Sequence, residues 1–314
     1  MARPPSMIAV LVMAYGGPDR IEDVEPYLLD VRGGRPLPPP GVAEIKRRYE
    51  LIGGRSPILE HTRAQADGLQ RALNSLGGNL RTYVGMRHWH PTVNEAVASI
   101  VADGIRKVVG LVMAPHYSRM SVELYFEKLP RAMEGVGASI EIERIDSWKD
   151  DLGYLAVLAE RIRDGLSRFP GEAAERVDLI FTAHSLPERI LTWEDPYPQE
   201  LQVTYDALRS QFPGHASYFA YQSAAMTPES WLGPDVRSLL DERLQAGRRD
   251  CLIVPIGFVS EHVEILYDID IDLRQRAEAG GGRLERIQMP GADPRMMASL
   301  ASRVRDAAAA KGWV

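Results

Sequence analysis

The sequence predicts an α/β protein with two doubly wound domains, each built around a mostly parallel sheet. Short apolar runs rich in Val, Ile and Leu alternate with longer segments of helical period. Such runs are typical of strands covered on both faces, and their alternation with helices is typical of parallel sheets with right-handed crossovers. At about 150 residues per domain, the 314 residues suffice for two domains. The expected strands are residues 8–13, 81–85, 107–114, 139–145, 177–183, 217–221 and 251–256.

The two halves resemble each other loosely, and this favours two similar domains. LVMAYGGP and LVMAPHYS occur in the first half, and LIFTAHSLP and LIVPIGFVSEH in the second. Apolar residues recur every three or four positions in residues 62–76 and 155–169, which predicts helices there. The expected domains are residues 1–148 and 149–291. The helical segment 292–314 can pack back on either of them and is grouped with the first.

Composition excludes several classes of protein. The formal charge of −6 argues against general nucleic-acid binding. A single cysteine, Cys251, excludes an internal disulfide framework and an iron–sulfur cluster held by four thiolates. The apolar stretch 7–15 is shorter than the ~20 residues of a membrane-spanning helix, and no small-residue cleavage site follows it. We therefore expect a cytoplasmic protein without a transmembrane segment.

A basic segment beside a proline-rich stretch stands out from this acidic background. Residues 33–41 read GGRPLPPPG, and the prolines predict a loop there, because proline lacks the backbone donor that helices and central strands use. Residues 32–55 contain six Lys or Arg against two Glu, a balance of +4, which leaves −10 for the rest of the chain. Such a loop is a plain connector about as often as a binding element. The local charge favours a small polyanionic ligand.

Polar side chains follow the predicted strands at the edge where ligands bind in doubly wound sheets. Five of the seven histidines lie there, although each taken singly is more often structural than a ligand: His88, His90, His116, His184 and His262. The His88-x-His90 pair is only a weak metal signal. No G-x-G-x-x-G, P-loop or G-x-S-x-G motif is present, so nicotinamide, nucleotide triphosphate and α/β-hydrolase chemistry have no support.

The segment after residue 260 carries an acidic stripe. Glu264, Asp268 and Asp272 are spaced by four residues, and Glu261 lies three before the first, so that all four share one face of a helix. Like charges at this spacing cost about 0.2–0.5 kcal/mol per pair. A solvated helix face is the plain explanation. The surrounding apolar residues indicate burial, and a buried carboxylate row needs protons or cations, which favours a path for protons or for a divalent metal.

Six motifs, in order along nearly the whole chain, resemble those of ferrochelatases. They are YGGP at 15–18, IGGRSP at 52–57, APHYS at 114–118, AHSLP at 183–187, WLGP at 231–234 and GFVSEHVEILYD at 257–268. The resemblance implies two Rossmann-like domains facing a porphyrin cleft, and the insertion of Fe²⁺ into a porphyrin in haem biosynthesis. It is closest to the soluble bacterial branch that metallates coproporphyrin III, in which Tyr-Gly follows the first strand.

The same resemblance implies roles for individual residues. His184 and Glu264 would face the inner pyrrole nitrogens as metal ligands and catalytic groups, with Asp268 and Asp272 as a proton relay. Tyr15 would lie on the opposite face of the ring. The positions that match those holding the porphyrin carboxylates in the family are Arg32, Arg48, Tyr49, Ser56 and Tyr125. Gly33 stands where close relatives carry a second basic residue, and Asp272 stands where a longer Glu is common.

The resemblance also sets expectations for ligands and partners. Fe²⁺ and coproporphyrin III are the expected substrates, with no tightly bound cofactor, no iron–sulfur cluster and no nucleic acid. We expect a monomer that contacts neighbouring haem-pathway enzymes transiently. Two alternatives stay open, a protoporphyrin IX ferrochelatase and a tetrapyrrole or haem carrier without catalytic activity. A cobalt or nickel chelatase is less favoured, because AHSLP together with the Glu264 segment points to the iron branch.

Overall fold

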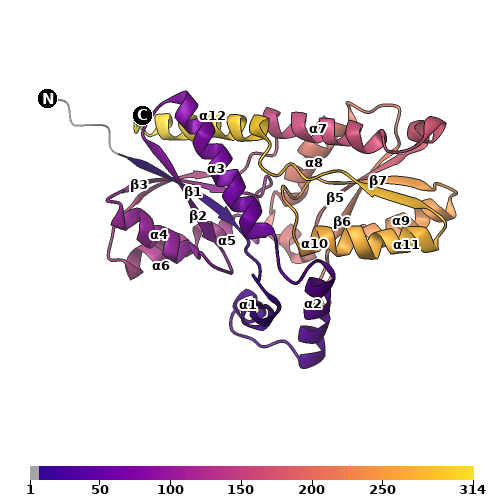
Figure 1. Ribbon diagram of the computed structural model, residues 1–314, viewed down its shortest axis with the longest axis horizontal. Helices are drawn as coiled ribbons and strands as arrows, with labels where there is room; N and C mark the ends of the chain where they lie inside the picture. The colour runs from indigo at the N-terminus through magenta and orange to yellow at the C-terminus, as the bar shows by residue number, and fades with distance from the viewer. Residues whose placement is uncertain (1–6, 226) are drawn as a thin grey trace. The chain divides into compact units, whose positions relative to one another are not determined.

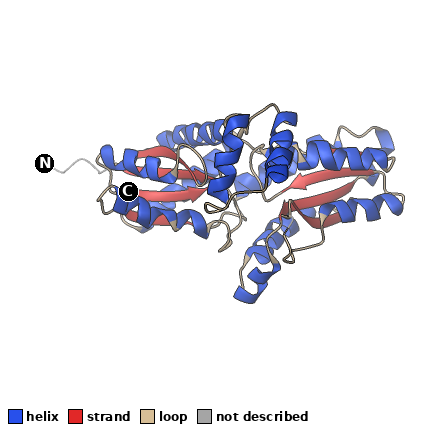
Figure 2. Ribbon diagram, turned by 90° about the horizontal axis from the view of Figure 1, so that it is seen from below, coloured by secondary structure: helices blue, strands red, loops and turns tan. Residues whose placement is uncertain are grey.

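The computed structural model describes residues 7–225 and 227–314, which divide into two compact units (Figure 1). Unit 1 comprises the described residues up to Gly153 together with Gly291–Val314, and unit 2 comprises Tyr154–Pro290. Each unit contains a four-stranded parallel sheet. Figure 2 shows each sheet as a layer with helices on both sides, and this confirms the predicted α/β class.

Unit 1 has the strand order β2-β1-β3-β4. The central strand β1 is buried along its whole length, because all seven of its side chains are apolar. The strands are β1 (Ile8–Ala14), β2 (Leu80–Met86), β3 (Lys107–Val112) and β4 (Glu141–Ile145). The helices are α1 (Val24–Val31), α2 (Pro39–Leu51), α3 (Ile58–Leu76), α4 (Val93–Ala102), α5 (Glu123–Phe126), α6 (Lys128–Gly135) and α12 (Pro294–Ala310).

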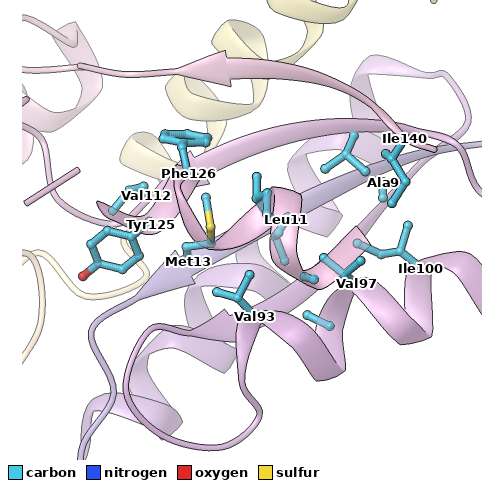
Figure 3. Close-up of a cluster of buried hydrophobic side chains, with 14 of the residues drawn as sticks. Ala9, Leu11, Met13, Val93, Val97, Ile100, Val112, Tyr125, Phe126 and Ile140 are labelled. Carbon is cyan, nitrogen blue, oxygen red and sulfur yellow. The ribbon is translucent and has the colours of Figure 1, made fainter. Parts of the chain in front are cut away.

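The core of unit 1 follows from the alternation of side chains along β1. Ala9, Leu11 and Met13 point to the same face of the sheet and meet apolar residues of α4, α5 and α6 (Figure 3). Helix α12 lies against α3, where the absence of a side chain at Gly68 admits Met297, since an added Cβ would lie 2.9 Å from the Met297 Cγ. The C-terminal helix therefore belongs to the core of unit 1.

Unit 2 repeats the topology with the order β6-β5-β7-β8. In each sheet the first strand of the unit is an inner strand and the third lies beside it. The strands are β5 (Asp178–His184), β6 (Ser217–Gln222), β7 (Asp250–Pro255) and β8 (Arg283–Arg286). The helices are α7 (Leu152–Leu166), α8 (Tyr197–Arg209), α9 (Val236–Gln245), α10 (Val263–Leu266) and α11 (Arg274–Ala279), with the 3₁₀ turns η2 (Gly171–Arg176) and η3 (Glu188–Trp193) and the π-helical turn η4 (Asp268–Leu273). In unit 1 a further 3₁₀ turn, η1 (Ile21–Asp23), precedes α1.

The structure corrects the sequence expectations at two elements. Strand β8 was not predicted, because three of its four residues are charged and only Leu284 is buried. The loop predicted for residues 33–41 ends early, since Pro39, Pro40 and Gly41 form the first turn of α2. Proline is well suited to this turn, where the backbone N–H has no intrahelical partner in any case.

The strand order locates the places where ligands bind in such sheets. The chain leaves the first strand of each unit toward one side and returns on the other, so the carboxyl ends of β1 and β3, and of β5 and β7, flank a topological switch point. None of the helices in residues 7–225 and 227–314 combines the length and hydropathy needed to cross a membrane.

Candidate functional site

The switch point of unit 2 brings together His184 and Glu264. His184 is the last residue of β5, and Glu264 lies in α10, which follows β7 after a short loop. The His184 Nδ1 and Glu264 Oε2 atoms are 2.9 Å apart. Gly257 permits this approach, because a Cβ there would lie 2.8 Å from the Ala183 Cβ. A glycine after β7 thus lets the loop pass directly over the end of β5.

The two side chains shift each other's protonation. Burial lowers the pKa of His184, but attraction and hydrogen bonding to Glu264, with a further contribution from Asp268, outweigh it and raise the pKa above 6.5. Burial raises the pKa of Glu264, and its pairing with His184 outweighs that and lowers it. The pairing therefore favours the charged forms of both groups, imidazolium and carboxylate. The side chains keep 34% and 29% of their surface exposed, which leaves them open to a ligand.

His262 lies beside this pair. Its Nε2 atom is 3.9 Å from Glu264 Oε2, and its ring packs against Phe258. Burial lowers the pKa of His262, with Glu264 acting in the opposite direction, so its imidazole is neutral at pH 7. Within the described residues, no three His, Cys, Asp or Glu side chains are arranged to hold a metal by themselves. A two-ligand site of imidazole and carboxylate suits Fe²⁺ and leaves coordination positions for water or substrate.

The acidic stripe continues from Glu264, but in a different helical form from the one predicted. Asp268 and Asp272 lie in the π-helical turn η4 and not in an α-helix. Each carboxylate has a hydrogen-bonding partner on another element: His184 contacts Glu264, the Ser223 hydroxyl donates to Asp268 at 2.5 Å, and the Arg237 Nε donates to Asp272 at 2.8 Å.

Glu261 is not part of the stripe, so the prediction of four aligned carboxylates was wrong. It lies before the first residue of α10, and its Oε1 atom is 3.8 Å from Arg286 Nη1. Arg286 also donates two hydrogen bonds of 2.8 Å to Asp270, whose role the spacing did not reveal. The spacing of side chains in a helix does not apply to Glu261, because Glu261 precedes the first residue of α10.

The end of β6 supports both His184 and Glu264, a role that was not predicted from the sequence. The side-chain oxygen of Gln222 accepts a hydrogen bond from Thr182 on β5, and its amide nitrogen donates to the Glu264 carbonyl at 2.9 Å. The Gln222 carbonyl accepts from the backbone N–H of Ser185, next to His184. A buried glutamine thus ties the end of β5 to α10.

The switch point of unit 1 presents Tyr15, which follows β1 and is 39% exposed. Its ring lies 4.7 Å from the His88 ring, and the Arg87 guanidinium lies 5.7 Å from its centroid. The same guanidinium lies 5.4 Å from the ring of Tyr125. The position of Arg87 after β2 was visible in the sequence, but only the fold shows that it links two of the predicted porphyrin-binding tyrosines.

The histidines of unit 1 do not form a metal pair. His88 is buried and its Nδ1 lies 2.7 Å from Asp30, whereas His90 is exposed and contacts Glu95. Burial lowers the pKa of His88 to about 4, despite the opposing contact with Asp30. Burial also lowers the pKa of His116 to about 3. Both imidazoles are therefore neutral at pH 7.

The two predicted porphyrin-binding arginines lie on neighbouring helices. Arg32 caps α1, and its Nε donates to the Arg35 carbonyl at 3.1 Å. Arg48 on α2 binds Glu44 at 3.0 Å, and Arg47 binds the same carboxylate at 2.9 Å. Hydrogen bonds from the two arginines lower the pKa of Glu44 to about 2.

The remaining predicted porphyrin-binding residues are buried in this structure. Tyr49, Ser56 and Tyr125 expose only 2%, 7% and 4% of their surface. Figure 3 shows the Tyr125 ring at the edge of the apolar cluster, with its hydroxyl directed away from the cluster. Ser56 lies next to the turn after β1, since a Cβ on Gly17 would lie 2.6 Å from the Ser56 side chain.

Comparisons with known proteins agree with the motifs. The family model described as ferrochelatase matches residues 7–308. A protein of Herpetosiphon aurantiacus named ferrochelatase is 42% identical over 287 residues, which cover 91% of this chain and 94% of that protein. A protein of Geobacillus kaustophilus named coproporphyrin III ferrochelatase is 41% identical over 300 residues, which cover 93% of each chain.

Solved structures add evidence for the fold alone. A structure of SirB from Bacillus subtilis with Fe³⁺ superimposes with a TM-score of 0.60 at 12% sequence identity. The match covers 98% of this chain and 97% of that chain. The fold of two four-stranded parallel sheets therefore recurs in a protein with little sequence similarity to this one.

Proposed function

The chain belongs to the ferrochelatase family, and from this premise we propose that it inserts Fe²⁺ into coproporphyrin III to give iron coproporphyrin III. The observation that carries the choice of porphyrin is Tyr15, a half-exposed phenol at the switch point of unit 1 with the Arg87 guanidinium beside it. A phenol oxygen can ligate the iron of the product, whereas an apolar side chain at this position would suit a protoporphyrin. The Geobacillus relative, named for coproporphyrin III, gives independent support.

The basic segment 32–55 supports the same choice. Its balance of +4 matches the four propionates of coproporphyrin III better than the two of protoporphyrin IX. Bidentate arginine–carboxylate contacts supply orientation as well as attraction. We assign this role to Arg32 and Arg48, with Tyr49, Ser56 and Tyr125 completing the contacts once the substrate is bound.

The reaction exchanges two pyrrole protons for one Fe²⁺ ion, so the site must hold a metal and accept protons. We assign both tasks to His184 and Glu264, which lie 2.9 Å apart. Binding of iron displaces the proton that the pair holds in the free enzyme, because only neutral imidazole is a ligand. Asp268 and Asp272 then carry protons away along the stripe. Bending the porphyrin ring exposes its nitrogen lone pairs and brings the substrate closer to the transition state.

An anaerobic assay with Fe²⁺ and each of the two porphyrins tests this proposal. The purified protein should metallate coproporphyrin III much faster than protoporphyrin IX. Tyr15→Met should alter the absorbance spectrum of the bound product, and Tyr15→Phe, which keeps the ring but not the oxygen, should alter it in the same way.

Equal or faster turnover of protoporphyrin IX would assign the chain to the other iron branch, as the plain name of the Herpetosiphon relative allows. A tetrapyrrole carrier would bind both porphyrins, as seen by absorbance, and metallate neither.

A further inference from the structure

Ser223, the first residue after β6, has an unusual backbone conformation. Its φ is +60°, in the left-handed region that L-residues other than glycine seldom adopt. Glu194 is the other such residue in the described parts of the chain, and it ends the turn η3 at the surface, where this conformation is common. Ser223 directly follows a strand instead. Unfavourable backbone conformations that persist away from helix ends are concentrated at functional sites.

The side chain of Ser223 shows what this conformation provides. Its hydroxyl donates to the Asp268 Oδ2 at 2.5 Å, and it receives a weaker contact of 3.4 Å from the amide of Gln222. Gln222 is itself fixed by Thr182 and by the carbonyl of Glu264. The carboxylate of Asp268 is thereby tied to the same strand end that supports Glu264.

Backbone requirements alone would favour glycine at position 223, because glycine adopts a positive φ without strain. Serine keeps the strain and adds only a hydroxyl, and that hydroxyl contacts the middle carboxylate of the acidic stripe. The carboxylates on either side of Asp268 have charged partners: Glu264 pairs with His184, and Asp272 pairs with Arg237. Ser223 supplies the corresponding uncharged contact.

We propose that Ser223 is a positioning residue for iron insertion, whose left-handed backbone directs its hydroxyl to Asp268 and holds this carboxylate in line between Glu264 and Asp272. The inference rests on the proposed function, since it assigns the stripe to proton transfer. Without this hydrogen bond the Asp268 carboxylate would be less well oriented and would receive a proton from the metal site less often. The effect therefore lies on the chemical step and not on substrate binding.

Two variants separate the hydroxyl from the backbone. Ser223→Gly removes the hydroxyl and relieves the strain, so Tm should stay the same or rise. The kcat of iron insertion should fall by up to about a hundredfold, which is the lower end of the contribution of proton transfer, while both KM values stay within about twofold. Ser223→Asn should restore most of kcat, because asparagine tolerates a positive φ and its amide can donate to a carboxylate.

Glu194→Gly is the matched control, since it relieves the same kind of backbone strain on the surface of the same unit and should leave kcat unchanged. The assay uses whichever porphyrin the wild-type protein metallates faster. An unchanged kcat in Ser223→Gly, or an equal loss of kcat in the Gly and Asn variants with a lowered Tm, would overturn the inference and leave the proposed function standing. Failure of the wild-type protein to metallate either porphyrin would refute both.

Discussion

At the scale of single residues, the ion pair of His184 and Glu264 makes iron binding depend on pH. The pKa of His184 is raised and that of Glu264 is lowered, so the free site holds a proton that Fe²⁺ must displace. The affinity for Fe²⁺ should therefore rise with pH through the pKa of His184. The pair stabilises the fold most between about pH 4.5 and 6.5, the unfolded pKa values of the two groups. This contribution is lost as the pH rises through the raised pKa of His184, and also as the pH falls through the lowered pKa of Glu264.

The first prediction is that Glu264→Gln abolishes most iron insertion and lowers the pKa of His184. Without the carboxylate, burial is the dominant influence on the imidazole, and burial disfavours its charged form. The pKa is measured by NMR titration of the imidazole, and porphyrin binding by absorbance. Asp268→Asn should lower the pKa of His184 less, because Asp268 contributes less to it. A His184 pKa that does not fall in Glu264→Gln would contradict the assignment of the ion pair.

The second prediction concerns the orientation of the porphyrin by Arg48. Arg48→Ala should raise the KM for the porphyrin about tenfold with a smaller change in kcat, because a charge-assisted hydrogen bond contributes about 1.5 kcal/mol at the low end. Arg47→Ala is the matched control, since Arg47 binds the same Glu44 from the next position. Steady-state kinetics of both variants check it. Equal KM values in the two variants would remove Arg48 from the binding site.

How far the site was predictable depended on whether its residues belong to local patterns. His184 and Glu264 were predicted because each follows a strand within a recognisable motif, and the structure places them 2.9 Å apart. Ser223 and Arg87 were not assigned roles, since their importance arises from contacts with residues far away in sequence. The local sequence around either residue does not indicate such a contact.

At the scale of elements, the acidic segment shows a limit of periodicity. A spacing of four residues fits both the 3.6 residues per turn of an α-helix and the wider π-helix, so the spacing predicted a helix without distinguishing the two forms. The structure contains a π-helical turn, η4, between the α-helical segments α10 and α11. Such turns occur often at functional sites. The seven strongest strands were predictable because their apolar runs are continuous, whereas the charged β8 was not.

The third prediction tests the close passage of the loop after β7 over the end of β5. Gly257→Ala would place a Cβ 2.8 Å from the Ala183 Cβ and 2.9 Å from its Cα, so the loop must move. The protein should lose about 1–3 kcal/mol of stability, as overpacked cores do, and Fe²⁺ binding should weaken because Glu264 moves with the loop. Gly214→Ala is the control, since nothing lies within 4 Å of its added Cβ. Denaturant unfolding and iron titration measure the two effects, and wild-type values for both would contradict this account of the loop.

At the scale of the whole molecule, two buried histidines contribute to the loss of stability in acid. Burial lowers the pKa of His88 to about 4 and that of His116 to about 3, against 6.5 when exposed. Below pH 6.5 these two imidazoles therefore become protonated in the unfolded chain while they stay neutral in the folded protein. Stability rises with pH in this range, because the unfolded state binds more protons.

The fourth prediction follows from this linkage. The free energy of unfolding should fall between pH 6.5 and 4 by about 1.4 kcal/mol per pH unit for each such histidine. His116→Asn should reduce that slope by about one such increment, whatever it does to stability at pH 7. Denaturant unfolding at several pH values measures it, with the exposed His90→Asn as control. An unchanged slope in His116→Asn would mean that His116 is protonated in the folded protein.

The position of α12 has a consequence for the order in which the protein can form. Unit 2 is continuous in sequence, whereas unit 1 needs Gly291–Val314 to cover α3. Ser299 and Arg303 of this helix also bind Asp151 at 2.8 Å each. On the ribosome, the strands of unit 1 emerge before unit 2, whereas α12 emerges after it. Unit 1 can therefore be completed only after unit 2, and α3 lacks its α12 partner while all of unit 2 is translated.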